Sequence, residues 1–184
     1  MEKLIIYLPA VLAVLGLLFM VSKSIWLAKQ DSGDSRMQAI SKSIEEGAMA
    51  FLKAEYKILF IFVIIASIAL FIVSALVETT HWVIVIAFIS GAFFSGLAGN
   101  IGMRIATRAN VRTTQAARTS LPQALKLSFT GGTVMGLGVA GLAVLGLSIF
   151  FLLFLKMFVT GQGDFYNEMT IVLEALAGFS LGAE

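Results

Sequence analysis

The sequence contains no cysteine and only one histidine, His81. The lack of cysteine excludes disulfide bonds, thiolate metal sites and cysteine nucleophiles. One histidine cannot form a multi-histidine metal site. Charged residues make up only 13% of the 184 residues, whereas soluble proteins average about 25%. Hydrophobic residues reach 59%, and the combination indicates an integral membrane protein.

Acidic residues are missing from the whole stretch between Thr79 and Gly163. Within it, the segment Gly91–Gly146 consists of two glycine-rich apolar runs joined by a basic connector. The basic residues of this connector are Arg104, Arg108, Arg112, Arg118 and Lys126. A soluble domain would balance this charge on its surface, so the pattern predicts a membrane hairpin with a cytoplasmic turn.

Four apolar segments are long enough to span a bilayer, which requires about 20 helical residues. They are Leu4–Leu27, Ile58–Val77, Trp82–Met103 and Gly132–Phe158. A fifth apolar run begins near Met169 and is too short to span before Glu184. We therefore expect an all-α, polytopic transmembrane helix bundle, with residues 1–184 as the N-terminal part of a single multi-span membrane domain. The first run exceeds the roughly 7–15 apolar residues of a signal peptide, which favours a retained span over a cleaved signal.

The distribution of lysine and arginine between the connectors predicts the orientation. The first connector contains five basic residues, namely Lys29, Arg36, Lys42, Lys53 and Lys57. The Glu78–His81 turn has none, and the Thr160–Glu168 loop has only Lys156 beside it. A multi-pass protein of the inner cell membrane is predicted, with an outward N-terminus and with the first and third connectors in the cytoplasm.

The first connector is expected to contain a helix that continues into the second span. The turn cluster Asp31–Ser35 supplies an N-cap, and Ser43 and Glu46 have capping-box spacing. Apolar or small residues recur on one face: Ile40, Ile44, Gly47 or Ala48, and Phe51. This face predicts packing against the membrane surface or neighbouring helices, and the alternative is a ligand-binding role for Glu45 and Glu46.

The glycines of the fourth span have two interpretations. Residues Gly136–Gly141 match GxGxxG, but a dinucleotide site also needs a preceding strand and an acidic residue about 20 positions later. Neither is present, so nucleotide binding is not predicted. Small residues also recur at intervals of four, in Gly132, Gly136 and Ala140 and in Gly91, Ser95 and Gly99. This spacing predicts close packing of the third and fourth spans against each other or against other helices.

Arg104, Arg108 and Arg112 lie on one helical face and have three interpretations. The first is contact with anionic lipid headgroups, the second is pairing with acids elsewhere in the protein, and the third is binding of an anionic substrate. Nucleic acid is not a predicted partner, because no aromatic residues alternate with these arginines to stack on bases.

Few other polar residues lie near the spans. Lys23 and Lys156 are near span ends and can reach the interface. Asn100 lies near the inner end of the third span, and Glu174 lies in the fifth apolar run. No carboxylate pair, serine elbow or phosphate-binding loop is present. The sequence predicts no catalytic, cofactor-binding or metal-ligating residue within residues 1–184.

Three strings carry a family resemblance: ISKSIEEGAMAFLKAEYK, GNIGMRIATRANVRTTQAAR and LPQALKLSFTGGTVMGLGVAGLAVLGL. Together they cover Ile40 to Leu147 and resemble the N-terminal region of membrane-integral, ion-pumping inorganic pyrophosphatases. The resemblance implies a homodimeric pump of about sixteen transmembrane helices. In such a pump, pyrophosphate hydrolysis at a cytoplasmic, Mg²⁺-rich site drives H⁺ or Na⁺ out of the cytoplasm. Some members of the family also require K⁺.

The sequence departs from the family in one respect. The family's acidic motif, of the form DVGADLVGKVE, follows the start of the fifth span, whereas this sequence ends at FSLGAE. The residues that bind magnesium pyrophosphate are therefore expected outside residues 1–184. Residues 1–184 would supply a helical scaffold and would be inactive when expressed alone. The alternative is a non-enzymatic membrane subunit or a secondary transporter of similar hydropathy.

Overall fold

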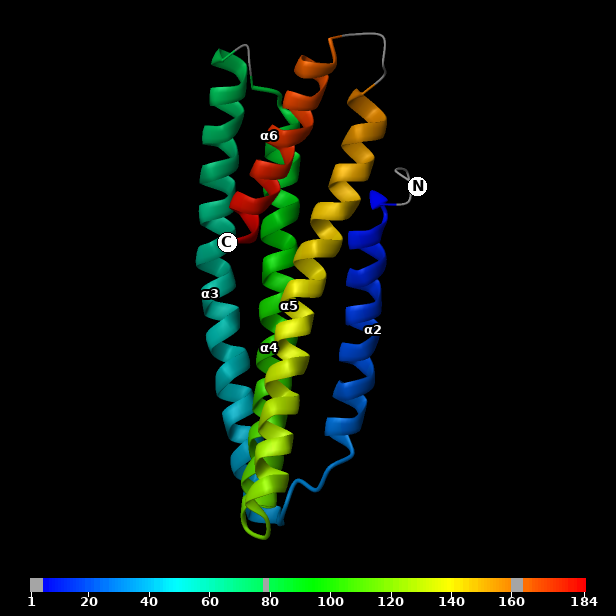
Figure 1. Ribbon diagram of the computed structural model, residues 1–184. Coiled ribbons are helices and arrows are strands. Elements are labelled where there is room, and N and C mark those ends of the chain that lie inside the picture. Colours follow the sequence, from blue (N-terminus) through cyan, green and yellow to red (C-terminus); the bar gives the residue numbers. More distant parts are fainter. Residues whose placement is uncertain (1–4, 78–79, 160–163) are drawn as a thin grey trace. The chain divides into compact units, whose positions relative to one another are not determined.

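The computed structural model describes residues 5–77, 80–159 and 164–184, and these ranges contain helices and no strand. The helices are α2 (Leu8–Ala28), α3 (Ser35–Leu76), α4 (Val83–Ala117), α5 (Leu121–Phe158) and α6 (Phe165–Ala183) (Figure 1). The predicted all-α fold is therefore confirmed.

Helices α2 to α5 are long and apolar enough to cross a membrane, and they contain the four predicted spans to within a few residues. The start of the first predicted span, Leu4, lies outside the described residues. In the most apolar window of α3 no residue is buried within the protein. Ile58 and Phe62 of this helix, for example, are 71% and 61% exposed. Such an apolar surface is suited to lipid as its surrounding solvent.

The predicted helix in the first connector is confirmed, and it runs without interruption into the second span as α3. Its N-cap is Asp34, whose Oδ1 accepts a hydrogen bond of 2.9 Å from the Met37 amide. Ser43 and Glu46, which have capping-box spacing, do not mark the start of the helix. Ser43 lies inside the helix, where its hydroxyl donates to the Ala39 carbonyl.

The third connector is much shorter than the predicted span ends imply. Helix α4 continues past Met103 to Ala117, and α5 begins at Leu121, so that residues 118–120 alone join them. The segment contains many good helix formers, including alanine, arginine and glutamine, and they extend both helices beyond their apolar parts.

Helix α6 also begins earlier than predicted, at Phe165 rather than near Met169. Asp164 caps it, because its Oδ1 accepts a hydrogen bond of 3.2 Å from the Tyr166 amide. The predicted Thr160–Glu168 loop is therefore helical from Phe165 onward. Residues 160–163 of this loop, like residues 78–79 of the turn between α3 and α4, lie outside the described residues.

The contacts divide the chain into two compact units. Unit 1 comprises the described residues of 1–13, 57–97 and 142–184, and unit 2 comprises residues 14–56 and 98–141. Helices α2 to α5 each contribute to both units, whereas α6 belongs to unit 1 alone.

In unit 1, α6 crosses α4 at two glycines that are four residues apart, Gly178 and Gly182. A Cβ added to Gly178 would lie 2.7 Å from the Ile84 carbonyl oxygen, and one on Gly182 would overlap the Phe88 carbonyl oxygen. Gly91 of α4 lies equally close to the α6 backbone. The two backbones therefore touch directly, as small residues at this spacing allow in membrane helices.

The core of unit 1 is centred on Phe179, which is 1% exposed. Its ring lies 5.8 Å from that of Phe94 on α4 and 5.3 Å from that of Phe150 on α5, measured between centroids. Gly146 of α5 provides the space for this ring, because a Cβ there would collide with it. The buried residues of this core are Val83, Ala87, Phe154, Val172, Ala175 and Phe179.

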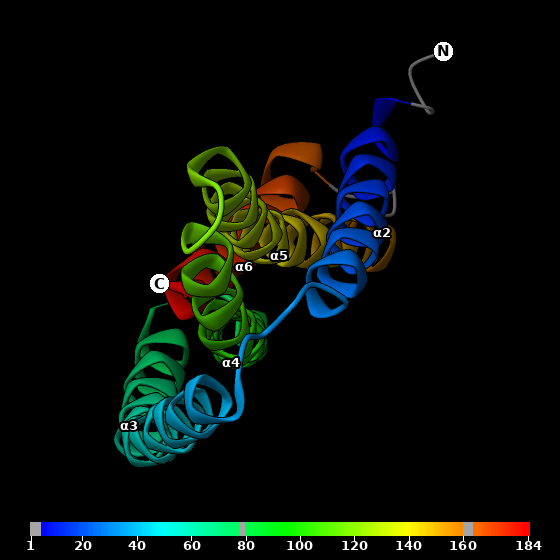
Figure 2. The same ribbon diagram turned by 90° about the horizontal axis from the view of Figure 1, so that it is seen from below.

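In unit 2, α4 lies between α3 and α5 (Figure 2). The core joins α2, α4 and α5 through Met20, Leu27, Ile105, Ala109, Ala116, Ala124, Leu127 and Val134. Gly131 of α5 packs against α4, since a Cβ on it would lie 2.8 Å from the Ala109 Cβ. Alanine and glycine thus bring these helices close together.

The predicted glycine rows are only partly used. Gly91 packs against α6, and a Cβ on Gly99 would lie 3.6 Å from the Tyr56 hydroxyl oxygen on α3. No described atom lies within 4 Å of a Cβ added to Gly132 or Gly136. The close contact predicted for that row is therefore not made among the described residues. Neighbouring glycines of α5, including Gly131, make the contacts instead.

The contact between α4 and α6 at Gly178 and Gly182 predicts that alanine in place of glycine lowers stability there. Gly182→Ala should destabilise the full-length protein by about 1–3 kcal/mol, because its methyl group would overlap the α4 backbone. Gly47→Ala is the matched control, since a Cβ there meets no described atom. It should be neutral or stabilise by about 0.5–1 kcal/mol, because alanine favours a helix. Thermal unfolding in detergent compares the two, and equal midpoints would contradict the crossing.

Candidate functional site

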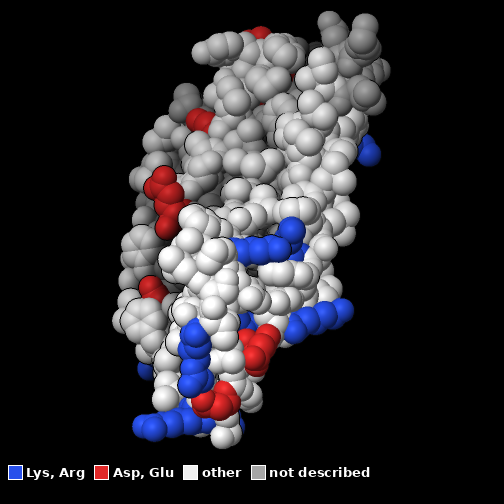
Figure 3. All heavy atoms as spheres, turned by 60° about the horizontal axis from the view of Figure 1, so that its bottom comes forward, with Lys and Arg blue, Asp and Glu red and all other residues white. Residues whose placement is uncertain are grey.

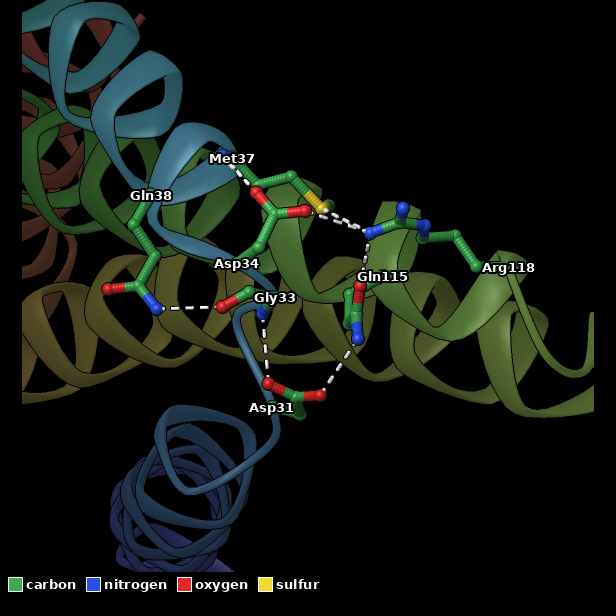
Figure 4. A network of polar contacts seen from close by, with 7 residues as sticks. All are labelled: Asp31, Gly33, Asp34, Met37, Gln38, Gln115 and Arg118. Atoms are coloured by element: carbon green, nitrogen blue, oxygen red, sulfur yellow. Dashed lines mark hydrogen bonds and ion pairs between the residues drawn. The ribbon is translucent and has the colours of Figure 1, made fainter.

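Charged side chains of unit 2 gather around the α2–α3 and α4–α5 connections (Figure 3). Here the first connector meets the C-terminal part of α4 in a network of polar contacts (Figure 4). We call this network the polar junction; its members are Asp31, Gly33, Asp34, Met37, Gln38, Gln115 and Arg118.

Asp31 joins the connector to α4. Its Oδ1 accepts a hydrogen bond of 2.9 Å from the Gly33 amide, and its Oδ2 accepts one of 2.9 Å from Gln115 Nε2. Gly33 has a φ of 81°, a conformation that favours glycine. The hydrogen bonds from Gly33 and then Gln115 lower the pKa of Asp31.

Asp34, three residues later, also joins the connector to the end of α4. Its Oδ1 caps α3 at the Met37 amide, and its Oδ2 forms an ion pair of 3.0 Å with Arg118 Nη1. The Met37 amide and then the Arg118 guanidinium lower the pKa of Asp34. Gln38 closes the turn by donating from Nε2 to the Gly33 carbonyl at 2.8 Å. Each aspartate therefore uses one oxygen to shape the connector and the other to hold α4.

Arg112 links α4 to the end of α2. Its Nη2 donates to the carbonyl of Ala28 at 2.9 Å, and its Nη1 donates to the carbonyl of Arg108 at 2.8 Å. Ala28 is the last residue of α2, where the carbonyls lack helical partners and favour a positive charge. The Nε of Arg112 is buried without a partner among the described residues.

The other two arginines of the row have different neighbours. Arg108 Nη2 lies 3.6 Å from Glu45 Oε1, so this arginine pairs with an acid. Arg104 Nε donates to Asn100 Oδ1 of the same helix at 2.9 Å. The Arg108 pair is partly exposed and so adds at most about 1 kcal/mol. The structure uses Glu45 in this ion pair, while Glu46 is exposed.

The remaining polar candidates lie apart from the polar junction. Glu174 of α6 belongs to unit 1, where its Oε2 accepts a bond of 3.4 Å from the His81 amide just before α4. Lys23 lies over the Phe19 ring, 5.2 Å from its centroid. Gly136–Gly141 lie inside α5, so this segment lacks the strand and turn that a dinucleotide-binding motif requires.

The described residues contain no group of three or more His, Asp or Glu side chains that could hold a metal ion. These residues therefore do not fit the Mg²⁺ site that the family resemblance implies. The location of catalytic and metal-binding residues outside residues 1–184 stays a prediction.

Sequence reasoning missed two features. The Gly178–Gly182 pair was detectable, because its spacing of four within GFSLG is a known signal for helix packing. The polar junction was not, since Asp31 and Gln115 are 84 positions apart and have no shared pattern.

These features define a polytopic membrane protein whose described polar groups support helix packing. The chain belongs to the inorganic H⁺ pyrophosphatase family, whose model, described as "Inorganic H+ pyrophosphatase", matches residues 14–184.

Named relatives agree with this family. A K⁺-stimulated, pyrophosphate-energized sodium pump of Thermotoga maritima is 42% identical over 146 residues, 78% of this chain and 19% of the relative. A K⁺-insensitive, pyrophosphate-energized proton pump of Moorella thermoacetica is 40% identical, over 94% of this chain and 23% of the relative. A K⁺-insensitive, pyrophosphate-energized proton pump of Methanosarcina mazei is 39% identical, over 84% of this chain and 22% of the relative. The chain thus spans less than a quarter of the length of each of these relatives.

The link between α2 and α4 predicts a difference between two arginines. Arg112→Gln should lower the stability of the full-length protein by roughly 1–3 kcal/mol, because the Ala28 carbonyl loses its charged donor. Arg104→Gln is the control, since Arg104 is exposed and its hydrogen bond to Asn100 lies within α4. Thermal unfolding in detergent measures both variants. A loss as large for Arg104→Gln as for Arg112→Gln would contradict the proposed link.

The polar junction also predicts a pH dependence. Both aspartates have a pKa below the ordinary value of 3.8. A group whose pKa is lowered by folding stabilises the folded state at pH values above its pKa in the unfolded chain. This stabilisation is lost as the pH falls through its pKa in the folded protein. Protection of the Met37 amide from hydrogen exchange should therefore be full near neutral pH and decrease below about pH 4. The Asp31→Asn/Asp34→Asn variant should lack this pH-dependent step. An identical step in both proteins would contradict the assignment.

Proposed function

We propose that the full-length protein hydrolyses inorganic pyrophosphate and couples this reaction to the transport of H⁺ or Na⁺ across a membrane. The observation that carries the proposal is the family match over residues 14–184, which includes every spanning helix except the first residues of α2. The names of the relatives, all pyrophosphate-energized pumps, support the same activity.

The transported ion does not follow from this segment. A sodium pump and two proton pumps match it with similar identities, between 39% and 42%. The relatives likewise include K⁺-stimulated and K⁺-insensitive proteins. The residues that select the ion and respond to K⁺ are therefore proposed to lie outside residues 1–184.

The role proposed for residues 1–184 is a helical scaffold. Polar side chains of unit 2 bond between elements to a backbone carbonyl, an amide or a partner of opposite charge, as in the polar junction and at Arg112. In the full-length protein, Mg²⁺ and pyrophosphate would bind residues elsewhere in the chain, within a homodimer. The basic α2–α3 and α4–α5 connections would face the cytoplasm and the N-terminus would face outward.

Membranes containing the full-length protein test the activity. We expect Mg²⁺-dependent hydrolysis of pyrophosphate and, in sealed vesicles, an ion gradient that forms only when pyrophosphate is supplied. Measuring H⁺ and ²²Na⁺ uptake with and without K⁺ assigns the ion. Absence of hydrolysis with Mg²⁺, Na⁺ and K⁺ all present would contradict the proposal. Residues 1–184 expressed alone are the control and should be inactive, and hydrolysis by them would contradict the scaffold role.

A further inference from the structure

A cavity of about 480 Å³ lies in unit 2 between the C-terminal end of α2 and the first turns of α5. It is lined by Trp26, Gln30, Ser120, Pro122, Gln123, Lys126 and Leu127. The polar residues of the lining are one lysine, two amides and one hydroxyl, and none of them is acidic. The cavity therefore offers hydrogen-bond donors and a positive charge to a ligand.

Lys126 supplies the positive charge. Its Nζ lies 5.5 Å from the centroid of the Trp26 ring, a cation–π contact with an uncharged side chain. The ion pairs of the described residues involve Arg108 and Arg118, and Lys126 has none. Lys126 therefore retains an uncompensated charge beside the cavity.

Donors complete the lining. Ser120 Oγ accepts from the Gln123 amide at 3.4 Å, so its hydroxyl proton is available to a ligand. Gln30 Nε2 donates one proton to the Trp26 carbonyl at 3.1 Å and has a second to offer. An anion with several acceptor oxygens fits this set of groups.

An apolar stripe lies beside these groups on α5. Leu121, Leu125 and Phe129, spaced four residues apart, are 69%, 48% and 73% exposed. Leu125 and Phe129 lie three residues after Pro122 and Lys126 of the cavity, and side chains at this spacing are neighbours on a helix, so the stripe and the cavity are adjacent. A ligand with both a phosphate and an acyl chain would contact both surfaces.

We propose that this cavity binds the phosphate headgroup of an anionic membrane lipid, with Lys126 pairing with the phosphate and the acyl chains lying along the stripe. Tryptophan at the end of a spanning helix and basic residues between helices are both suited to lipid headgroups. This function is additional to the proposed pump activity and does not depend on it. The chemistry that the cavity recognises is a phosphate monoanion or dianion, and the stripe assigns it to a lipid.

Native mass spectrometry of the detergent-solubilised full-length protein tests the site with dioleoyl phosphatidylglycerol as the probe and dioleoyl phosphatidylcholine as the neutral comparison. Lys126→Gln should weaken phosphatidylglycerol binding about fivefold, the effect of one basic residue near a membrane surface. Lys126→Arg should retain binding. Lys156→Gln is the matched control, because Lys156 is an exposed lysine on the same helix outside the cavity lining.

The outcomes distinguish the sources of the phosphate. Phosphatidylglycerol binding that depends on Lys126 and resists millimolar inorganic phosphate and pyrophosphate supports the lipid site. Displacement by either free anion, with the same dependence on Lys126, would overturn the lipid assignment in favour of a soluble phosphate. Equal binding by Lys126→Gln, Lys156→Gln and the unmodified protein, each eluting as one species on gel filtration, would overturn the site.

Discussion

The structure depends on how helices associate where lipid replaces water. Apolar side chains gain nothing by leaving lipid for one another, so packing requires close backbone approach or polar contacts. The most apolar window of α3 shows the consequence, because none of its residues is buried among the described part of the chain. Hydrophobic residues make these helices insert, and other residues decide how they pack.

Each unit uses its own means of packing. In unit 1, Gly178 and Gly182 let α6 touch the backbone of α4, and Gly146 leaves room for the Phe179 ring. In unit 2, glycine and alanine pack α5 against α4, while Asp31, Asp34 and Arg112 hold the first connector and the end of α2. These polar contacts of unit 2 lie in a region rich in charge (Figure 3).

Much of this architecture follows from the sequence. Hydropathy locates the four spans because each needs a long apolar segment, and the Asp31–Ser35 cluster predicts the start of α3 because a short polar side chain caps a helix. Helix ends outside the apolar segments are less predictable, since alanine- and arginine-rich sequence continues α4 to Ala117. Hydropathy carries no information on where such a helix stops.

Contacts between helices were predicted least well. The row of Gly132 and Gly136 has the same spacing as Gly178 and Gly182, yet only the second pair touches another described helix. Spacing identifies a surface that permits close approach, but the partner depends on the whole arrangement of helices. The ion pair between Asp34 and Arg118 could not be predicted either, because it too depends on the arrangement of the helices, although both charges are evident in the sequence.

The central claim is that residues 1–184 brace a pyrophosphate-driven pump without binding its substrate. The most direct test is the KM for pyrophosphate of the full-length protein carrying Arg104→Gln and Arg108→Gln, which removes two of the exposed cations that could attract this anion. A scaffold role predicts a KM within about twofold of the unmodified protein. A rise of about tenfold or more with unchanged thermal stability would contradict the account and place this arginine face at the substrate.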